Sequence, residues 1–182
     1  MANNENPNQI HLKGVRLSYP NLGEAKGFQG SEPKFSATFI LDKEKDADQI
    51  KEIKAKIAAM VATDFKGKSP GPDKICLKDG TSKGDSEGYG EGVMYISASN
   101  KRKPALVDQK RNPIDKDDPR IFGGVYVNAV VNIWKQDNQY GKRINASLEA
   151  VQYARTGDAF GNAPMNVNNV FEELPDETDS PL

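Results

Sequence analysis

The sequence contains one cysteine and one histidine in 182 residues. Cys76 therefore has no intramolecular disulfide partner, and with His11 it cannot supply the Cys/His ligand set of a structural zinc site. A chain without paired cysteines is typical of a reducing compartment. We expect no metal and no other cofactor. His11 lies in a strand-like segment, and we interpret it as a surface or packing residue rather than a catalytic base.

Long apolar runs are also missing from the sequence. No stretch approaches the roughly 18 apolar residues of a transmembrane helix, and the first residues lack the apolar centre of a signal peptide. We therefore expect a soluble, cytoplasmic protein. A length of 182 residues suits a single domain with its own hydrophobic core.

Basic residues are absent after Arg155, whereas six acids follow it, from Asp158 to Asp179. Taking those six from 26 Asp and Glu leaves 20 acids against 25 Lys and Arg in residues 1–155, so a net charge of −1 divides into +5 and −6. A basic body attracts polyanions, and an acidic tail on the same chain can compete for that surface. The sorting favours a nucleic-acid binder, although charge alone fits a solubilising tail equally well.

Most of the chain alternates apolar and polar residues, which predicts strands. One segment, residues 44–64, instead repeats its apolar residues at helical spacing and predicts the one long helix. Residues 66–92 are rich in Gly, Lys, Ser and Pro and predict an exposed loop with a short pairing at 75–77. The predicted strands are 10–19, with a bulge at Gly14 and an end at Pro20, then 34–42, 93–98, 105–107, and a hairpin over 125–148.

Five or more strands with one inserted helix predict a mainly β, OB-fold-like Greek-key barrel. We place this barrel at residues 10–157. Residues 1–9 are polar without periodicity and predict a disordered N-terminal arm, and residues 158–182 predict a flexible acidic C-terminal tail.

Candidate catalytic residues are few. Asp115, Asp117 and Asp118 form the only dense acidic group in the body, and such a group can hold Mg²⁺ in a metal-dependent nuclease. They lie between Pro113 and Pro119 in a polar stretch with no strand to hold them rigid and no histidine beside them to serve as a base. We expect a solvated loop and no enzymatic activity, with the nuclease as an alternative.

Basic residues interleaved with aromatic ones are the remaining signal. Cations follow the phosphates of a single strand, and aromatic rings stack on its bases whatever their identity. For each aromatic residue the alternative is burial or an ordinary cross-strand pair. The cationic candidates are Lys101, Arg102, Lys103, Lys110, Arg111, Lys142 and Arg143, and the stacking candidates are Tyr95, Tyr126, Trp134 and Tyr140.

Several sequence pieces, in this order, resemble a family of bacteriophage proteins that bind single-stranded DNA, a family long catalogued as a domain of unknown function. The resemblance covers residues 12–157 and depends on the order of the pieces more than on any one of them. The pieces are Val15–Leu22, Lys34–Phe39, Ile96–Ala98, Lys103–Pro104, Val107–Asp108, Gly123–Ala129 and Leu148–Tyr153.

The resemblance implies an OB-fold that coats single-stranded DNA without sequence preference during phage replication or recombination in the host cytoplasm, without catalysis. It also implies contacts of the acidic tail with replication or recombination proteins. A homo-oligomer or a cooperative assembly on DNA is a further expectation. Tails of the broader class commonly end on an aromatic residue, whereas this chain ends on Pro181 and Leu182. The alternative is a phage structural or assembly protein whose barrel serves protein–protein interaction.

Overall fold

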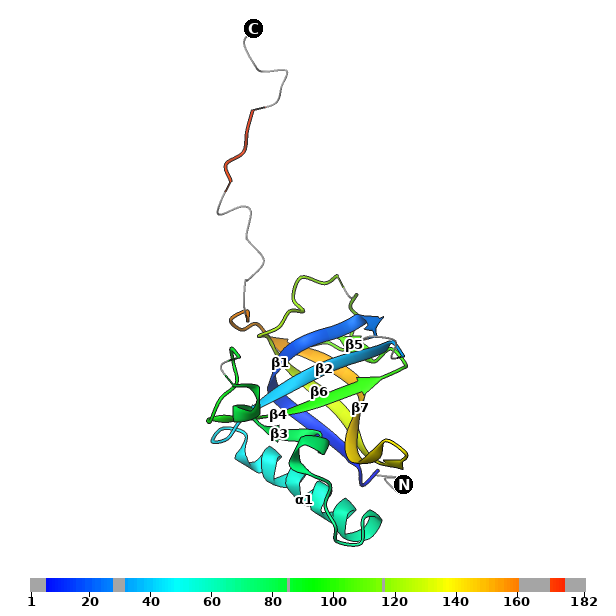
Figure 1. The fold of residues 1–182 in the computed structure, drawn as a ribbon. Coiled ribbons are helices and arrows are strands. Elements are labelled where there is room, and N and C mark those ends of the chain that lie inside the picture. Colours follow the sequence, from blue (N-terminus) through cyan, green and yellow to red (C-terminus); the bar gives the residue numbers. More distant parts are fainter. Residues whose placement is uncertain (1–5, 28–31, 85, 116, 161–170, 176–182) are drawn as a thin grey trace.

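A computed structural model describes residues 6–27, 32–84, 86–115, 117–160 and 171–175 (Figure 1). Within these ranges it contains one α-helix, seven strands and two 3₁₀ turns. In chain order they are β1 (Gln9–Lys26), β2 (Lys34–Asp42), α1 (Ala47–Asp64), η1 (Pro72–Lys74), β3 (Leu77–Asp79), η2 (Gly80–Lys83), β4 (Val93–Asn100), β5 (Ala105–Val107), β6 (Tyr126–Asn138) and β7 (Gly141–Arg155).

The strands form one sheet in the order β3-β4-β2-β1-β6-β7-β5. A further parallel contact between β4 and β7, at Ser99 and Ser147, joins the sheet to itself. Strands β4, β2, β1, β6 and β7 thus close into a five-stranded barrel, while β3 and β5 extend its edges (Figure 1). This closure confirms the predicted OB-fold-like barrel.

Alternation along each strand places one set of side chains in the barrel. In β6 the inward residues Val127, Ala129, Val131 and Ile133 are buried, and the alternate residues face outward. The prediction of one core face and one mixed face in this strand is therefore confirmed. Helix α1 packs its apolar stripe, which includes Ile53 and Ile57, against the lower end of the barrel (Figure 1).

Strand β1 is longer than predicted. The bulge at Gly14 is confirmed, because the register with β6 shifts between Leu12 and Val15 and Gly14 has a φ of 63°. The predicted end at Pro20 is wrong. A second irregularity between Ser18 and Asn21 accommodates the proline outside the ladder, so β1 continues to Lys26.

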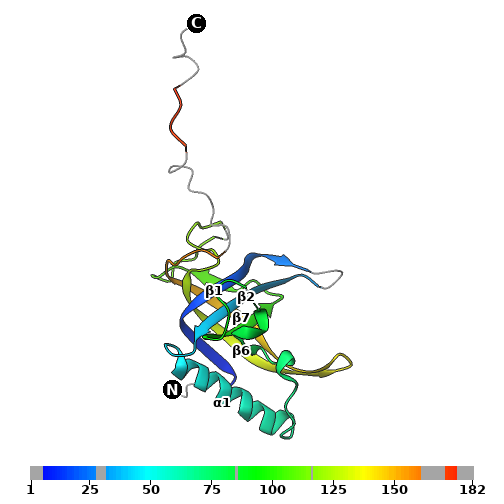
Figure 2. The same ribbon diagram turned by 60° about the vertical axis from the view of Figure 1, so that its left-hand side comes forward.

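The bends in β1 and the length of β6 and β7 shape the outside of the barrel. Both the β1–β2 hairpin and the β6–β7 hairpin extend beyond the barrel on the same side of the molecule (Figure 2). The segment between α1 and β4 is more regular than the predicted loop. It pairs through Ile75 with Ile144 and through β3 with β4, so the predicted short pairing at 75–77 is confirmed and extends to Asp79.

The predicted arm and tail lie mostly outside the described residues, namely 1–5, 161–170 and 176–182. Residues 158–160 and 171–175 contain no helix or strand. In the part of the chain that the structure describes, no helix is both long and apolar enough to cross a membrane.

Candidate nucleic-acid interface

A groove runs over the outward face of β2 and β4 and between the ends of the two long hairpins. It consists of two adjoining hollows of about 450 and 770 Å³. The hollows are continuous because they share five lining residues, Lys34, Ser36, Ser99, Trp134 and Gln136. We call this continuous surface, lined by the residues of both hollows, the cationic groove. The face of the second and third barrel strands is where OB-folds bind oligonucleotides.

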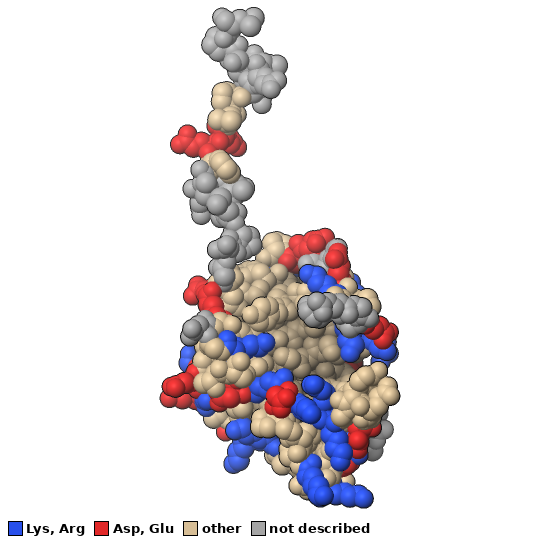
Figure 3. All heavy atoms as spheres, in the orientation of Figure 1, with Lys and Arg blue, Asp and Glu red and all other residues tan. Residues whose placement is uncertain are grey.

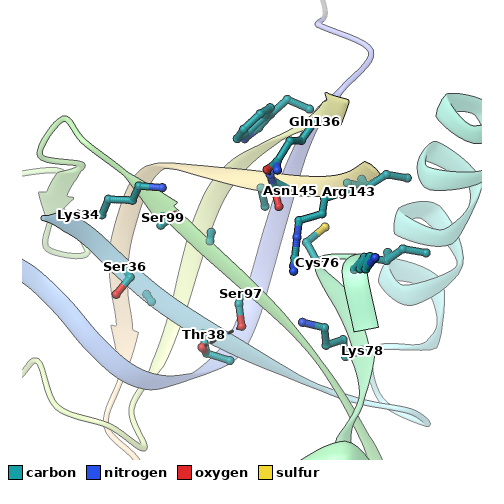
Figure 4. Close-up of a pocket in the computed structure, with 17 residues that line it drawn as sticks. Lys34, Ser36, Thr38, Cys76, Lys78, Ser97, Ser99, Gln136, Arg143 and Asn145 are labelled. Atoms are coloured by element: carbon teal, nitrogen blue, oxygen red, sulfur yellow. Dashed lines mark hydrogen bonds between the residues drawn. The ribbon is translucent and has the colours of Figure 1, made fainter. Parts of the chain in front are cut away.

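Positive charge dominates the groove. Among the described residues that line it, Glu32 is the one carboxylate. Figure 3 shows Lys and Arg across the middle and lower part of the face seen in Figure 1. In the close-up, Lys34, Lys78 and Arg143 approach from β2, β3 and β7 respectively (Figure 4). The six cationic lining residues are Lys26, Lys34, Lys74, Lys78, Lys101 and Arg143.

Small hydroxyl side chains make the floor of the groove. Ser36 and Thr38 from β2 lie beside Ser99 and Ser97 from β4, as the antiparallel register requires (Figure 4). The hydroxyls of Thr38 and Ser97 are 3.2 Å apart and hydrogen-bonded. Short polar side chains leave room for a polymer to lie close to the sheet. Because a hydroxyl both donates and accepts, this floor favours no particular base.

Two exposed aromatic side chains of the β6–β7 hairpin line the groove. Trp134 is 43 % exposed, and Tyr140, in the turn between β6 and β7, is 77 % exposed. Asn145 lies opposite Trp134 in the ladder and donates a hydrogen bond to the Gln136 side chain at 2.8 Å. Exposed rings next to cations are the combination that stacks on unpaired bases.

The one acid in the groove leaves its cationic partner available. Lys101 Nζ lies 2.8 Å from a Glu32 carboxylate oxygen, and both side chains are more than half exposed. An exposed pair of this kind contributes about 0–1 kcal/mol. A phosphate can therefore displace Glu32 from Lys101 at little cost.

The structure brings together some of the predicted site residues. Lys101, Trp134, Tyr140 and Arg143 all line the groove. The remaining cationic candidates are exposed but do not line it. Arg102 and Lys103 are in the same turn as Lys101, Lys142 lies opposite Asp137 in the β6–β7 hairpin, and Lys110 and Arg111 are in the connection from β5 to β6.

Two predicted stacking residues have their rings occupied. Tyr95 is only 4 % exposed, and its hydroxyl is 2.7 Å from the hydroxyl of Ser82. Its ring offers no open face to a base, so we leave Tyr95 out of the interface. The Arg155 guanidinium lies 3.6 Å from the centre of the Tyr126 ring, and Tyr126 lies away from the groove. Tyr126 thus already has a cation on one face.

Four groove lysines were not predicted: Lys26, Lys34, Lys74 and Lys78. They are spread along the sequence, one or two per element, so no basic cluster marks them. A signal did exist for Lys34, because strand alternation places it on the same outward face as Ser36 and Thr38. Lys78 reaches the groove because β3 pairs with β4, and Lys74 reaches it because the next residue, Ile75, pairs with Ile144 of β7.

Asp118, one of the three acids considered as a nuclease site, has a structural role. Asp118 accepts two hydrogen bonds from the Arg120 guanidinium, at 2.9 and 2.8 Å. The hydrogen bonds from Arg120 lower the pKa of Asp118 to about 2. Within the described ranges, no three His, Cys, Asp or Glu side chains are grouped to hold a metal ion.

Comparison with known proteins identifies the family. Residues 8–181 match the model of the family described as "Enterobacter phage Enc34, ssDNA-binding protein". The chain is 36 % identical over 176 residues to "Putative protein p50" of Acyrthosiphon pisum secondary endosymbiont phage 1, covering 91 % of this chain and 94 % of that one.

Solved structures agree with the family match. The single-stranded DNA-binding protein from bacteriophage Enc34 in complex with ssDNA superimposes with a TM-score of 0.77 at 30 % identity, over 86 % of this chain and 91 % of that one. The single-stranded DNA-binding protein encoded by bacteriophage T7 shares the fold, with a TM-score of 0.54 at 14 % identity over 91 % and 95 % of the two chains. The resemblance found in the sequence is therefore confirmed, and the chain belongs to the family of phage single-stranded-DNA-binding proteins represented by that of Enterobacter phage Enc34.

Proposed function

We propose that this protein binds single-stranded DNA in the cationic groove, without sequence preference and without catalysis, and coats it during phage replication or recombination in the host cytoplasm. The observation that carries the proposal is the groove itself. It combines six cationic side chains with the exposed rings of Trp134 and Tyr140 over a floor of small hydroxyls. The solved complex of the Enc34 protein with ssDNA supports it.

The chemistry of the groove selects single strands over duplexes. Phosphates along a strand are neutralised by Lys and Arg, and the released counterions make binding salt-dependent. Stacking on Trp134 or Tyr140 needs bases with a free face, which a duplex does not offer. Any base has such a face, so a strand of any sequence fits.

The acidic tail fits this function as a competitor for the groove. Residues 156–182 carry six acids and no Lys or Arg. A tethered segment has a high effective concentration near its own domain even when its intrinsic affinity is weak. We propose that the tail weakens binding to DNA until a single strand displaces it, and that it also contacts replication or recombination proteins.

Fluorescence anisotropy with labelled oligonucleotides tests the proposal. Single strands of several sequences should bind with similar affinity, and the duplex should bind more weakly. All affinities should decrease as the salt concentration rises from low to physiological. Lys51→Gln is a matched control for groove variants such as Lys34→Gln, because Lys51 is exposed on α1 and does not line the groove.

Two other functions predict different results. A structural or assembly protein would bind no oligonucleotide at any salt concentration. A metal-dependent nuclease would cleave a labelled strand in the presence of Mg²⁺, and Asp117→Asn would abolish that cleavage. Either result would overturn the proposal.

A further inference from the structure

A second recess lies on the outside of the barrel beyond the cationic groove. Its volume is about 420 Å³. Two aromatic side chains, Tyr19 of β1 and Phe160 after β7, form its aromatic walls, and Ser18 and Gly123 also line it. We call it the Tyr19 recess. An aromatic-walled recess with a hydroxyl beside it is suited to a flat, partly polar ring.

Tyr19 is held in a backbone conformation that bulky residues rarely adopt. Its φ is 46°, in the left-handed region, at the irregularity of β1 between Ser18 and Asn21. Such a conformation is energetically unfavourable and persists where the surrounding structure enforces it, often at binding sites. In this conformation the Tyr19 side chain is 58 % exposed, so more than half of its surface is open to solvent.

The Tyr19 ring is fixed in place by the loop between η2 and β4. It stacks on Tyr89, with ring centres 6.4 Å apart and planes at 26°. Tyr89 is fixed in turn, because its hydroxyl donates to Ser18 Oγ at 2.9 Å and its ring meets the edge of the buried Tyr95 at 5.2 Å. A base stacking on Tyr19 would therefore meet a ring that is already positioned.

Phe160, the second aromatic wall of the recess, contacts Arg16. The guanidinium carbon of Arg16 lies 4.1 Å from the centre of the Phe160 ring. The same side chain donates hydrogen bonds to the carbonyls of Asp158 at 2.6 Å and Gly124 at 3.0 Å. The Phe160 amide donates to the Gly123 carbonyl at 2.9 Å. Both walls are thus anchored to the barrel.

Cationic groups adjoin both walls. Lys83 Nζ lies 5.9 Å from the centre of the Tyr19 ring and 5.6 Å from that of Tyr95, and the Arg16 guanidinium lies over the Phe160 ring. Glu87 is the one acid among the described residues that line the recess. Lys83 is exposed and close enough to meet the phosphate of a nucleotide whose base enters the recess.

The recess is one strand away from the cationic groove. Ser18 of β1, which lines the recess, pairs with Thr38 of β2, and Thr38 pairs with Ser97 of β4. Thr38 and Ser97 both line the groove. Neighbouring strands are about 4.8 Å apart, so a strand of DNA leaving the groove at Thr38 reaches Tyr19 within a nucleotide or two.

We propose that the Tyr19 recess is a second nucleobase subsite, in which a base of the strand bound in the groove stacks on Tyr19. The inference extends the proposed function and depends on it. It predicts that the bound strand spans both regions, so that affinity continues to increase with strand length until the recess is filled.

A length series of oligothymidylates, from about 4 to 16 nucleotides, tests the subsite. Tyr19→Asn removes the ring while asparagine tolerates the left-handed backbone. This variant should match the wild type on the shortest strands that bind and bind the longest about 5- to 150-fold more weakly. Tyr19→Phe keeps the ring and should restore the wild-type length dependence. Wild-type affinity of Tyr19→Asn at every length would overturn the subsite.

Two controls separate the possible failures. If the wild type binds no single strand at all, the proposed function fails first. If Trp134→Ala weakens binding while Tyr19→Asn does not, only the subsite fails. A third measurement needs no variant: photo-crosslinking of wild-type protein to strands carrying one 5-iodouracil. Crosslinks to Tyr19 from one end of the strand support the subsite, and crosslinks confined to groove residues contradict it.

Discussion

Trp134 lies directly opposite Asn145 in the β6–β7 ladder, and both side chains line the cationic groove. The pair places the only tryptophan of the chain at the edge of the proposed DNA path. At this point of β6 the outward face carries an aromatic ring beside cations, and Ile133 is the last buried residue of the inward face.

Trp134 should report DNA binding. We predict that its emission is quenched by a saturating single-stranded oligonucleotide, because an indole stacked on a base loses fluorescence. Trp134→Ala should reduce binding by about 1–3 kcal/mol, and Trp134→Phe should reduce it less. Since Trp134 is 43 % exposed, the Phe variant should keep the wild-type melting temperature. Unchanged emission together with a strongly destabilised Phe variant would mean that Trp134 is a packing residue.

Lys34 should contribute one phosphate contact. We predict that Lys34→Gln lowers the slope of log affinity against log salt concentration by about 0.7 for a single strand. Lys51→Gln, on the exposed face of α1, should leave the slope unchanged. Titrations at four or more salt concentrations measure both slopes. Equal slopes for wild type and Lys34→Gln would show that Lys34 does not contact a phosphate of the bound strand.

Removal of the acidic tail should tighten binding at low salt. Truncation after Asn169 deletes five acids and no bases, which changes the formal charge from −1 to +4. The Debye length falls from about 30 Å at 0.01 M to about 8 Å at 0.15 M ionic strength, so the difference from the full chain should narrow over that range. Anisotropy at both ionic strengths measures it. Identical affinities at 0.01 M would reduce the tail to a solubilising or partner-binding segment.

Cys76 should be protected in the native protein. It is 6 % exposed, and burial raises its thiol pKa from 9.0 to about 11. Because the thiolate is the reactive form, we predict that an aromatic disulfide reagent modifies native protein slowly at pH 8 and urea-unfolded protein rapidly. Unfolded chains also lose the thiol proton at lower pH than native ones, so this thiol's contribution to stability is lost as pH rises from 9 to 11. Equal modification rates in the two states would show that Cys76 is accessible.

Fold and family were predictable because they depend on local patterns repeated along the chain. The alternation of apolar and polar residues in β6 and the helical spacing of apolar residues in α1 are each repeated several times. One residue that departs from the pattern therefore does not change the prediction. The continuation of β1 past Pro20 was not predictable in this way. It depends on an irregularity that lets the proline lie outside the ladder, and only pairing with β2 reveals it.

The site was predictable only in part because it is built from distant segments. Three of the predicted candidates that line the groove, Trp134, Tyr140 and Arg143, belong to one hairpin and are close in sequence. Lys78 joins them through β3, and Lys34 through the closure of the barrel. Tyr95 shares the outward face of β4 with Ser97, but it is buried and contacts Tyr89 and Ser82, which is the alternative considered for each aromatic candidate. Burial of an outward-facing side chain by a loop cannot be predicted from the alternation of residues in its strand.

Lysine footprinting tests the central claim most directly. The free protein and its complex with a single-stranded oligonucleotide are acetylated separately and analysed by mass spectrometry. The extent of acetylation of each lysine is then compared between the two samples. The groove lysines Lys34, Lys78 and Lys101 should be protected by DNA, whereas the exposed Lys51 and Lys54 of α1 should react equally in both states. Protection of the α1 lysines with full reactivity at Lys34 and Lys78 would contradict binding in the groove.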